Sequence, residues 1–325
     1  MVYPNLSVTS DALKWRFCYG HEKISYTPSA RMYYLVIGSF YIVISLLAIN
    51  FNMMFLTTIR RNRRLHRLSN YLLVFLCVID LISACVIMPS YAVILAARYQ
   101  NITYCSLRTF TSIAGYCLAS MSFISILSIT IEQYTAIVYP FFHQSHVTLK
   151  SITQIIVVSW FIASIWCVGA WFIEGLWITY QTFLGCFIFL TYVFIIYCYS
   201  RLFILVKHTE KRMHSTRKQF ETKNELNRRN KAVRTSSLII LAFSISYVPI
   251  AFITIWRYFY GATVFERTFI YEGVHLLSLC NTFINPIVYY WRLSDVRREI
   301  LKLFWVKTRK NSVKYSQEEA ITCVK

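Results

Sequence analysis

Charged residues are scarce in this chain. They make up 15% of its 325 residues, whereas a soluble domain carries about 25%, and 57% of the residues are hydrophobic. Acidic residues are scarcest, since 14 Asp and Glu stand against 34 Lys and Arg and leave a net charge of +20. A basic RNA-binding protein would hold its apolar residues in a soluble core, which runs of about 20 apolar residues argue against. We therefore expect a membrane protein that binds no nucleic acid.

Features of other membrane-protein classes are also missing. Residues 1–30 have no apolar central region, so we expect no cleaved signal peptide and a first span that starts insertion itself. Transporters show paired broken helices in two halves, and this sequence has no internal repeat. An enzyme needs a metal cluster or a nucleophile beside a base, and the apolar segments contain neither, so we expect no enzyme.

What the chain does have is a series of apolar segments, each long enough to cross a bilayer, which takes about 20 residues. They cover residues 32–59, 69–97, 104–138, 150–174, 179–207, 231–257 and 268–291. We predict an all-α membrane protein, a seven-transmembrane helix bundle. Its expected organisation is an extracellular tail over 1–31, the bundle with a short amphipathic eighth helix over 32–304, and a cytoplasmic tail over 305–325.

Basic residues concentrate in alternate connecting segments, and Lys and Arg accumulate on the cytoplasmic side of membranes. They lie between the first two spans, around the fifth–sixth loop and in the tail: Arg60, Arg61, Arg63, Arg64, Arg67, Lys207, Lys211, Arg212, Arg217, Lys218, Lys223, Arg228, Arg229, Lys231, Arg234, Arg297, Arg298, Lys302, Lys307, Arg309, Lys310 and Lys314. The predicted location is the plasma membrane with an extracellular N-terminus. This topology places both glycosylation sequons, at Asn5 and Asn101, outside the cell.

The last span ends in Asn285-Pro286-Ile287-Val288-Tyr289. Pro286 weakens a membrane helix at one point, which is tolerated where neighbouring helices satisfy the freed backbone groups. A basic segment with interleaved apolar residues follows and predicts the eighth helix along the inner membrane surface.

Asp80 lies in the middle of the second span. A carboxylate there costs about 2.5–3.5 kcal/mol on insertion scales, so it should face the bundle interior and have polar partners. The candidate partners, from three other spans, are Asn52, Ser122, Asn281 and Asn285. The group can simply lock the packing as a hydrogen-bonded acid, or form a polar core that rearranges when the helices move. We favour the rearranging core.

Together these motifs resemble those of the rhodopsin-type (class A) G protein-coupled receptors over roughly residues 32–304. The matching positions are Asn52, Asn70 and Asp80 in the first two spans, Glu132-Gln133-Tyr134 in place of Asp-Arg-Tyr, Trp160 in the fourth span, Tyr199 in the fifth, Phe243 and Ser246-Tyr247-Val248-Pro249 in the sixth, and Asn285 to Tyr289 as an intact NPxxY. All of them occur in the family's order and in separate spans.

The resemblance implies a cell-surface receptor that binds an extracellular ligand and activates a heterotrimeric G protein through helix rearrangement. It implies a sodium pocket at Asp80, with Ser122, Asn281 and Asn285, and no other cofactor. Tyr199 and Tyr289 are expected to swing together on activation, and Pro249 to kink the sixth helix. The full expected switch comprises Glu132, Gln133, Tyr134, Tyr199, Phe243, Tyr247, Pro249, Pro286 and Tyr289.

Gln133 departs from the family, whose Arg at this position engages the G protein or pairs with an acid at the base of the sixth span. Here the facing position is near Arg229, so that ion pair cannot form. We expect altered basal activity or weak coupling. The alternative function is a receptor-like decoy or heteromer partner that couples weakly.

A branch within the family is also indicated. Thr191 stands where the fifth span usually has Pro, and the loop before that span is nearly absent. These traits resemble the melanocortin, adenosine, lysophospholipid and cannabinoid receptors. The family's disulfide joins the top of the third span to the loop after the fourth, so the resemblance favours Cys105–Cys186. Cys18–Cys105 remains the rival, because sequence does not set connectivity.

The ligand is indicated mainly by absences. Amine receptors of the family carry an Asp where this chain has Gly115, and opsins carry a Lys where it has Leu279. We therefore expect neither a biogenic amine nor retinal, and consider a lipid, a nucleoside-like molecule or a short peptide. The candidate pocket residues are Tyr116, Tyr247, Arg257, Glu272 and His275. Membrane lipids and arrestin are further expected partners.

Overall fold

The structure is a computed structural model. It describes residues 28–66, 68–173, 176–214, 244–256, 259–260, 265, 269–292 and 296–301. The site and motif residues named above that lie outside these ranges are Asn5, Cys18, Arg229, Phe243 and Arg257. The basic residues outside them are Arg67, Arg217, Lys218, Lys223, Arg228, Lys231, Arg234, Lys302, Lys307, Arg309, Lys310 and Lys314.

The described chain is a bundle of long helices, as the apolar segments predict. The elements are α2 (Pro28–Arg61), η2 (Arg63–Leu65), α3 (Leu68–Ile82), η3 (Ser83–Ile87), α4 (Met88–Tyr99), α5 (Cys105–Val138), α6 (Pro140–His146), α7 (Leu149–Phe172), α8 (Leu176–His214), a helix over Ser244–Trp256 and α10 (Tyr271–Arg292). Five spans within the described ranges are long and apolar enough to cross a membrane. α10 has enough length, but its polar side chains make it less apolar.

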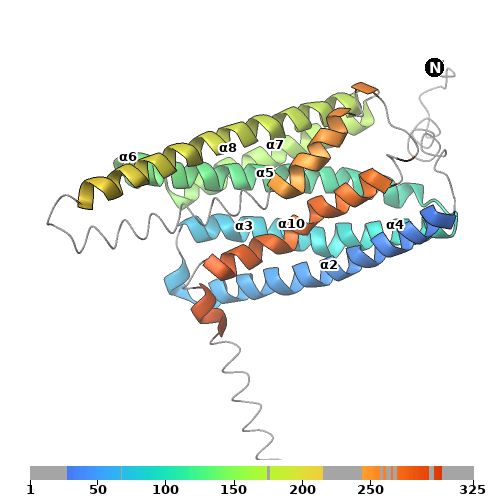
Figure 1. Ribbon diagram of the computed structural model, residues 1–325, viewed down its shortest axis with the longest axis horizontal. Coiled ribbons are helices and arrows are strands. Elements are labelled where there is room, and N and C mark those ends of the chain that lie inside the picture. Colours follow the sequence, from blue (N-terminus) through green and yellow to red (C-terminus); the bar gives the residue numbers. More distant parts are fainter. Residues whose placement is uncertain are drawn as a thin grey trace, which may run out of the picture.

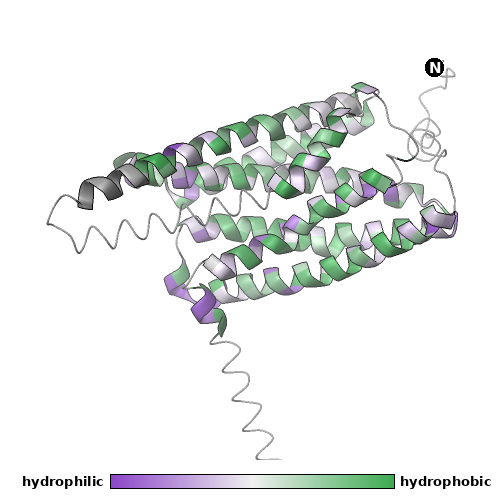
Figure 2. Cartoon of the chain, viewed as in Figure 1, coloured by the Kyte–Doolittle hydropathy of each residue, from purple (hydrophilic) through white to green (hydrophobic). Residues whose placement is uncertain are grey.

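The helices lie side by side along the long axis of the molecule (Figure 1). α5 is central, because it packs against α3, α4, α7 and α8, while α2 packs against α4 and α10. We call the end that carries Pro28, Tyr99 and Cys105 the amino-terminal end, and the end that carries η2 the basic end. Figure 2 shows the most hydrophilic residues where α2 meets η2, with hydrophobic residues along the helices.

The second span is one continuous helical rod with a wide turn in its middle. Ser83–Ile87 form a π-helical turn between α3 and α4, and Pro89 follows at the start of α4. Proline has no N–H and its ring pushes away the carbonyl four residues earlier, so the helix widens here. The Ser45 hydroxyl of α2 donates to the freed neighbouring carbonyl of Ala84 at 2.7 Å. The turn changes which side chains between Asp80 and Tyr99 face the bundle interior.

Apolar side chains cover the outside of the bundle as well as its inside. On α7, Phe161, Ile165 and Trp166 are 66%, 68% and 55% exposed. In water such a stripe would be a liability, whereas in a bilayer it contacts lipid, and every helical backbone group is satisfied internally. The exposed stripe is therefore the lipid-facing surface of a membrane helix.

The cysteines correct one prediction. Cys105 is disulfide-bonded, whereas Cys186 is free and lies on the exposed side of α8. The expected Cys105–Cys186 pair is therefore wrong: the chain leaves α7 at Phe172 and enters α8 at Leu176, so Cys186 falls within the helix rather than in a loop. Seven described cysteines are free, and of the ten in the sequence only Cys18 and Cys323 lie outside the described ranges. The rival partner Cys18 stays a prediction.

A buried ion pair ties α4 to α10 at the amino-terminal end. Arg98 Nη1 lies 2.5 Å from Glu272 Oε1, and the two residues are only 7% and 5% exposed. The Arg98 guanidinium also stands 5.6 Å from the ring centroid of Tyr34 on α2, within range of a cation–π contact. Glu272 was predicted to contact ligand, but its carboxylate is committed to Arg98 instead.

We expect Glu272→Ala to lower the free energy of unfolding by about 3–5 kcal/mol, because it leaves a buried guanidinium without its counter-charge. Thermal unfolding of the detergent-solubilised protein measures this. The apolar double replacement Arg98→Met/Glu272→Leu should recover most of the loss. Glu299→Ala is the control, since its 3.9 Å pair with the 65% exposed Arg298 side chain contributes little. Equal melting temperatures for Glu272→Ala and the control would contradict this account.

Candidate functional site

A hydrogen bond in the middle of the bundle joins α3 to α10. Asn285 Nδ2 donates to Asp80 Oδ2 at 3.1 Å, and the two residues are 0% and 3% exposed. The carboxylate is thus buried and partnered, as its cost in the membrane requires. Of the predicted partners, Asn285 contacts Asp80 directly and Ser122 lines the same cavity.

Asn52 has a different task from the one predicted. Its Nδ2 donates to the Ala48 carbonyl at 2.8 Å and to the Thr282 carbonyl at 2.9 Å. Thr282 stands four residues before Pro286, so its carbonyl is the one that the proline leaves without a helical donor. Asn52 of α2 therefore stabilises the weak point of α10 and makes no hydrogen bond to Asp80 among the described residues.

The polar core has the groups that a hard cation such as sodium needs. Such ions prefer carboxylate, hydroxyl and amide oxygens. Asp80 Oδ1 accepts no hydrogen bond from a described residue, and the two polar atoms of the buried Asn281 side chain have no partner among the described residues. Asp80 and Ser122 line one cavity and fit the predicted sodium site, whereas Asn281 does not line that cavity. The described residues contain no group of three His, Cys, Asp or Glu suited to a transition metal.

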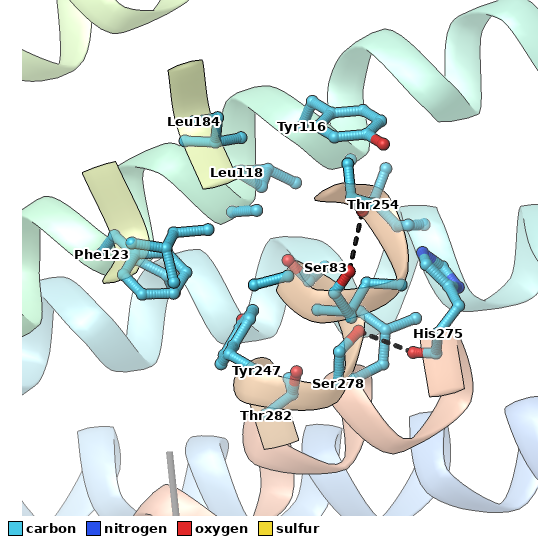
Figure 3. Close-up of a pocket in the computed structure, with 18 of the residues that line it drawn as sticks. Ser83, Tyr116, Leu118, Phe123, Leu184, Tyr247, Thr254, His275, Ser278 and Thr282 are labelled. Atoms are coloured by element: carbon cyan, nitrogen blue, oxygen red, sulfur yellow. Dashed lines mark hydrogen bonds between the residues drawn. The ribbon is translucent and has the colours of Figure 1, made fainter. Parts of the chain in front are cut away.

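A cavity of about 100 Å³ lies between α3, η3, α4, α5, α8, the Ser244–Trp256 helix and α10. Its wall is formed by Asp80, Ser83, Ile87, Tyr91, Ser112, Gly115, Tyr116, Leu118, Ala119, Ser122, Phe123, Leu184, Gly185, Ile188, Tyr247, Ile250, Ala251, Thr254, Tyr271, His275, Ser278, Leu279 and Thr282. Figure 3 shows Tyr247, Ser278 and Thr282 gathered on one side and Tyr116 on the opposite side.

Three of the predicted pocket residues line this cavity: Tyr116, Tyr247 and His275. His275 Nδ1 is hydrogen-bonded to Tyr41 Oη at 2.7 Å, and its ring centroid is 4.4 Å from that of Tyr91. The imidazole is therefore fixed in the wall. Glu272 does not line the cavity, and Arg257 lies outside the described residues.

Sequence reasoning missed the aromatic residues Tyr91 and Tyr271 in the wall. Tyr91 comes two residues after Pro89, beyond the π-helical turn, so a regular helical period counted from Asp80 does not give its direction. The proline was the available signal, but a proline predicts a distortion and not its size.

Tyr247 of the sixth-span motif contacts Phe123 of the third span in the wall of the cavity. The ring centroids of Tyr247 and Phe123 are 4.7 Å apart in an edge-to-face arrangement, and both residues line the cavity. Such pairs are among the more favourable aromatic contacts. Tyr247 therefore stands between the cavity and the core that packs toward the basic end.

At the basic end, Gln133 and Glu132 are both engaged. The Tyr199 hydroxyl of α8 donates to Gln133 Oε1 at 2.9 Å. Glu132 Oε1 accepts from the Ser69 hydroxyl at 3.0 Å and lies 3.4 Å from His143 Nε2 of α6, a helix that the sequence analysis did not predict. Gln133 thus keeps a polar contact without a charge, and α6 rests against the third span.

Tyr289 completes this region from α10. It is fully buried, and its ring centroid lies 5.3 Å from that of Phe55 on α2. Tyr199 and Tyr289 belong to one hydrophobic core cluster, so the two expected moving tyrosines are already inside the same half of the bundle. Tyr134 packs at the edge of that cluster.

Comparisons with known proteins agree with this geometry. The family "7 transmembrane receptor (rhodopsin family)" matches residues 51–177 and 167–289. Trace amine-associated receptor 9 of Rattus norvegicus is 25% identical over 301 residues, covering 82% of this chain and 85% of the relative. Trace amine-associated receptor 6 of Homo sapiens is 24% identical over 320 residues, covering 89% and 90%.

The family match and the match to the human relative each cover nearly the whole bundle rather than a single motif. They leave the closer resemblance to the melanocortin, adenosine, lysophospholipid and cannabinoid branch untested. Asp80, Asn285 and the buried Tyr289 all lie within the residues that match the family. This chain belongs to the rhodopsin family of seven-transmembrane receptors and is a G protein-coupled cell-surface receptor, not an enzyme.

Proposed function

We propose that a small extracellular molecule enters the cavity from the amino-terminal end and shifts the bundle toward a state that activates a G protein at the basic end. The orientation rests on charge: Arg60, Arg61, Arg63 and Arg64 lie at one end, which is the cytoplasmic end by the distribution of Lys and Arg. Asn101 lies at the other end, exposed, where its sequon can be glycosylated.

The observation that carries this proposal is that one cavity touches both the outer aromatic residues and the polar core. Tyr116 and His275 line it, and so do Asp80 and Tyr247. A ligand changes a conformational equilibrium only if it contacts groups that differ between the two states. A molecule in this cavity touches the carboxylate that joins α3 to α10, so its binding energy can act on that contact directly.

The size and lining of the cavity narrow the ligand class. A volume of about 100 Å³ favours a molecule of few heavy atoms, or the end of a lipid or short peptide, over a whole nucleoside-like molecule or peptide chain. Apolar side chains form most of the wall, and a few hydroxyls set the orientation, as in other small-molecule sites. The relatives are named trace amine-associated receptors, yet Gly115 offers no carboxylate at the position that amine receptors use.

The basic end offers the surface for a G protein. Basic residues there attract an acidic partner, arrestin or the anionic inner leaflet. Gln133 occupies the position of the family's Arg, and its side chain accepts a hydrogen bond from Tyr199. The position therefore keeps a defined polar contact at the basic end. A decoy or heteromer partner is therefore the less favoured function.

We expect Gly115→Leu to reduce the potency of an agonist found by ligand screening by about tenfold or more, because the new side chain occupies the cavity. A Cβ at this position meets only Ile87 Cγ2, at 3.8 Å, so the fold itself tolerates a side chain there. G protein activation in cells, normalised to surface expression, measures the effect. Gly169→Leu is the matched control, since a Cβ there has no neighbour within 4 Å. An unchanged potency in Gly115→Leu would reject this cavity as the ligand site.

Tyr199→Phe should weaken agonist-stimulated G protein activation. Its hydroxyl donates to Gln133 and joins α8 to α5, and one such hydrogen bond contributes about 1 kcal/mol, or about fivefold in a conformational equilibrium. The control is Tyr197→Phe in the same helix, whose side chain is 54% exposed. A response equal to wild type in both variants would show that the Tyr199–Gln133 bond has no part in activation.

A further inference from the structure

We propose that the ligand carries a carboxylate, which binds the guanidinium of Arg108 where the cavity opens toward the amino-terminal end. This inference rests on the proposed function, because it takes the cavity as the ligand site, and it adds the charge of the ligand. Arg108 is a partly buried residue near the start of α5, four residues before Ser112 in the cavity wall.

The first argument is placement. Ser112 and Gly115 of α5 line the cavity, and Arg108 precedes them by four and seven residues, so the three residues share one face of the helix. Helical side chains lean toward the start of their helix, which puts the guanidinium above the wall and not in it. Arg108 interacts electrostatically with Tyr91 on α4 and Tyr271 on α10, and both tyrosines line the cavity. The cation therefore stands at the entrance.

The second argument is charge. Arg108 interacts electrostatically with Arg98 and Glu272 as well, but the Glu272 carboxylate is paired with Arg98. Two guanidiniums and one carboxylate leave this group of three with a net positive charge. Glu272 is the only acid that the structure describes at the amino-terminal end, so Arg108 has no acid of its own there. A guanidinium that leaves water is stabilised most by a hydrogen-bonded anion.

The third argument is hydrogen bonding. A guanidinium holds its N–H donors in a planar fork that fits the two oxygens of a carboxylate. The Arg108 side chain donates to no described residue, and its backbone N–H is the part that bonds, to the Tyr104 carbonyl. The hydroxyls of Tyr91 and Ser112 line the cavity and make no hydrogen bond to a described residue either. Donors from two helices are thus available to one carboxylate.

The start of α5 gives independent support. Its first turn contains no acidic residue, and the side chain of the N-cap residue Tyr104 makes no capping hydrogen bond. The first turn of a helix carries a partial positive charge, which an acidic side chain would complement and a cation opposes. Helix stability therefore does not explain an arginine at position 108. A bound carboxylate would be attracted by the guanidinium and by the helix start together.

The cavity below Arg108 selects the rest of the ligand. Ile87, Gly115 and Leu279 offer it apolar or small surfaces, so the tail should be aliphatic or a single ring. Tyr91 follows Asp80 by 11 residues, roughly 16 Å along the helix, so the ligand carboxylate stays far from the Asp80 carboxylate. A monoanion neutralises the net charge of the entrance, whereas a phosphate monoester carries about −1.5 to −2 at neutral pH and exceeds it. We therefore favour a carboxylate over a phosphate.

The test uses the full-length receptor in lipid nanodiscs at neutral pH, with thermal stabilisation as the binding readout. The probes are hexanoate and phenylacetate, each against its neutral alcohol, hexanol or phenylethanol. Hexyl phosphate and hexylammonium carry the same tail with a different charge. We expect the carboxylates to bind about 10- to 100-fold more tightly than the alcohols, the range that hydrogen bonds to a charged group support. Hexyl phosphate and hexylammonium should both bind more weakly than hexanoate.

Variants of two arginines assign the effect to one side chain. Arg108→Gln should lower the affinity for the carboxylates to that for the alcohols and leave the alcohols unchanged. Arg31→Gln is the matched control, because it removes the same charge from the same end of the bundle, on α2, at a residue that does not line the cavity. Arg108→Lys keeps the charge without the fork, so its affinity for hexanoate should fall between those of wild type and Arg108→Gln. If Arg108→Gln does not fold, Arg108→Lys decides the question, since hexanoate must bind it more weakly than wild type.

The inference is overturned if the carboxylates bind no more tightly than the alcohols, if hexyl phosphate or hexylammonium binds more tightly than hexanoate, or if Arg108→Gln and Arg31→Gln bind hexanoate equally well. These outcomes leave the proposed function intact as long as some other agonist acts and Gly115→Leu blocks it. An agonist whose potency is indifferent to Gly115→Leu removes the site itself, and with it both proposals.

Discussion

The hydrogen bond from Asn285 to Asp80 is the contact on which the rest of this receptor depends. A carboxylate inside a membrane bundle is expensive unless it is partnered, and this partner lies directly before the proline inside α10. Asn52 takes the carbonyl that Pro286 frees, so α2, α3 and α10 meet at a single polar point. The polar contacts that join these three helices therefore lie where the helices can also move.

The two halves of the molecule are built around that point in different ways. Toward the amino-terminal end, the Arg98–Glu272 pair ties α4 to α10 above a cavity whose floor is Asp80. Toward the basic end, aromatic packing and the Tyr199–Gln133 bond hold α5 and α8 together without the charge that the family usually places there. Because Gln133 is neutral, the contacts that hold the basic end depend less on an ion pair and more on packing.

Much of this architecture was predictable from the sequence, and the exceptions have physical causes. Helix spans and the Asp80–Asn285 contact followed from apolar length and from the cost of a membrane carboxylate. The pairing of Glu272 with Arg98 did not, because it joins residues 174 positions apart, and Glu272 was expected to contact a ligand. Tyr91 was missed because a π-helical turn alters the helical register before it. The Cys105–Cys186 pair was wrong because it was carried over from the family, while this chain has almost no loop in which Cys186 could sit.

The most direct measurement of the central claim is an exchange of the two partners, Asp80→Asn with Asn285→Asp. Each single change alters the charge or the donor on one side of the contact, whereas the double change recreates a carboxylate facing an amide between the same helices. Agonist-stimulated G protein activation, normalised to surface expression, should be lost in both single variants and regained at least in part in the double variant. If the double variant is no more active than the worse single variant, the Asp80–Asn285 contact does not connect the cavity to the basic end.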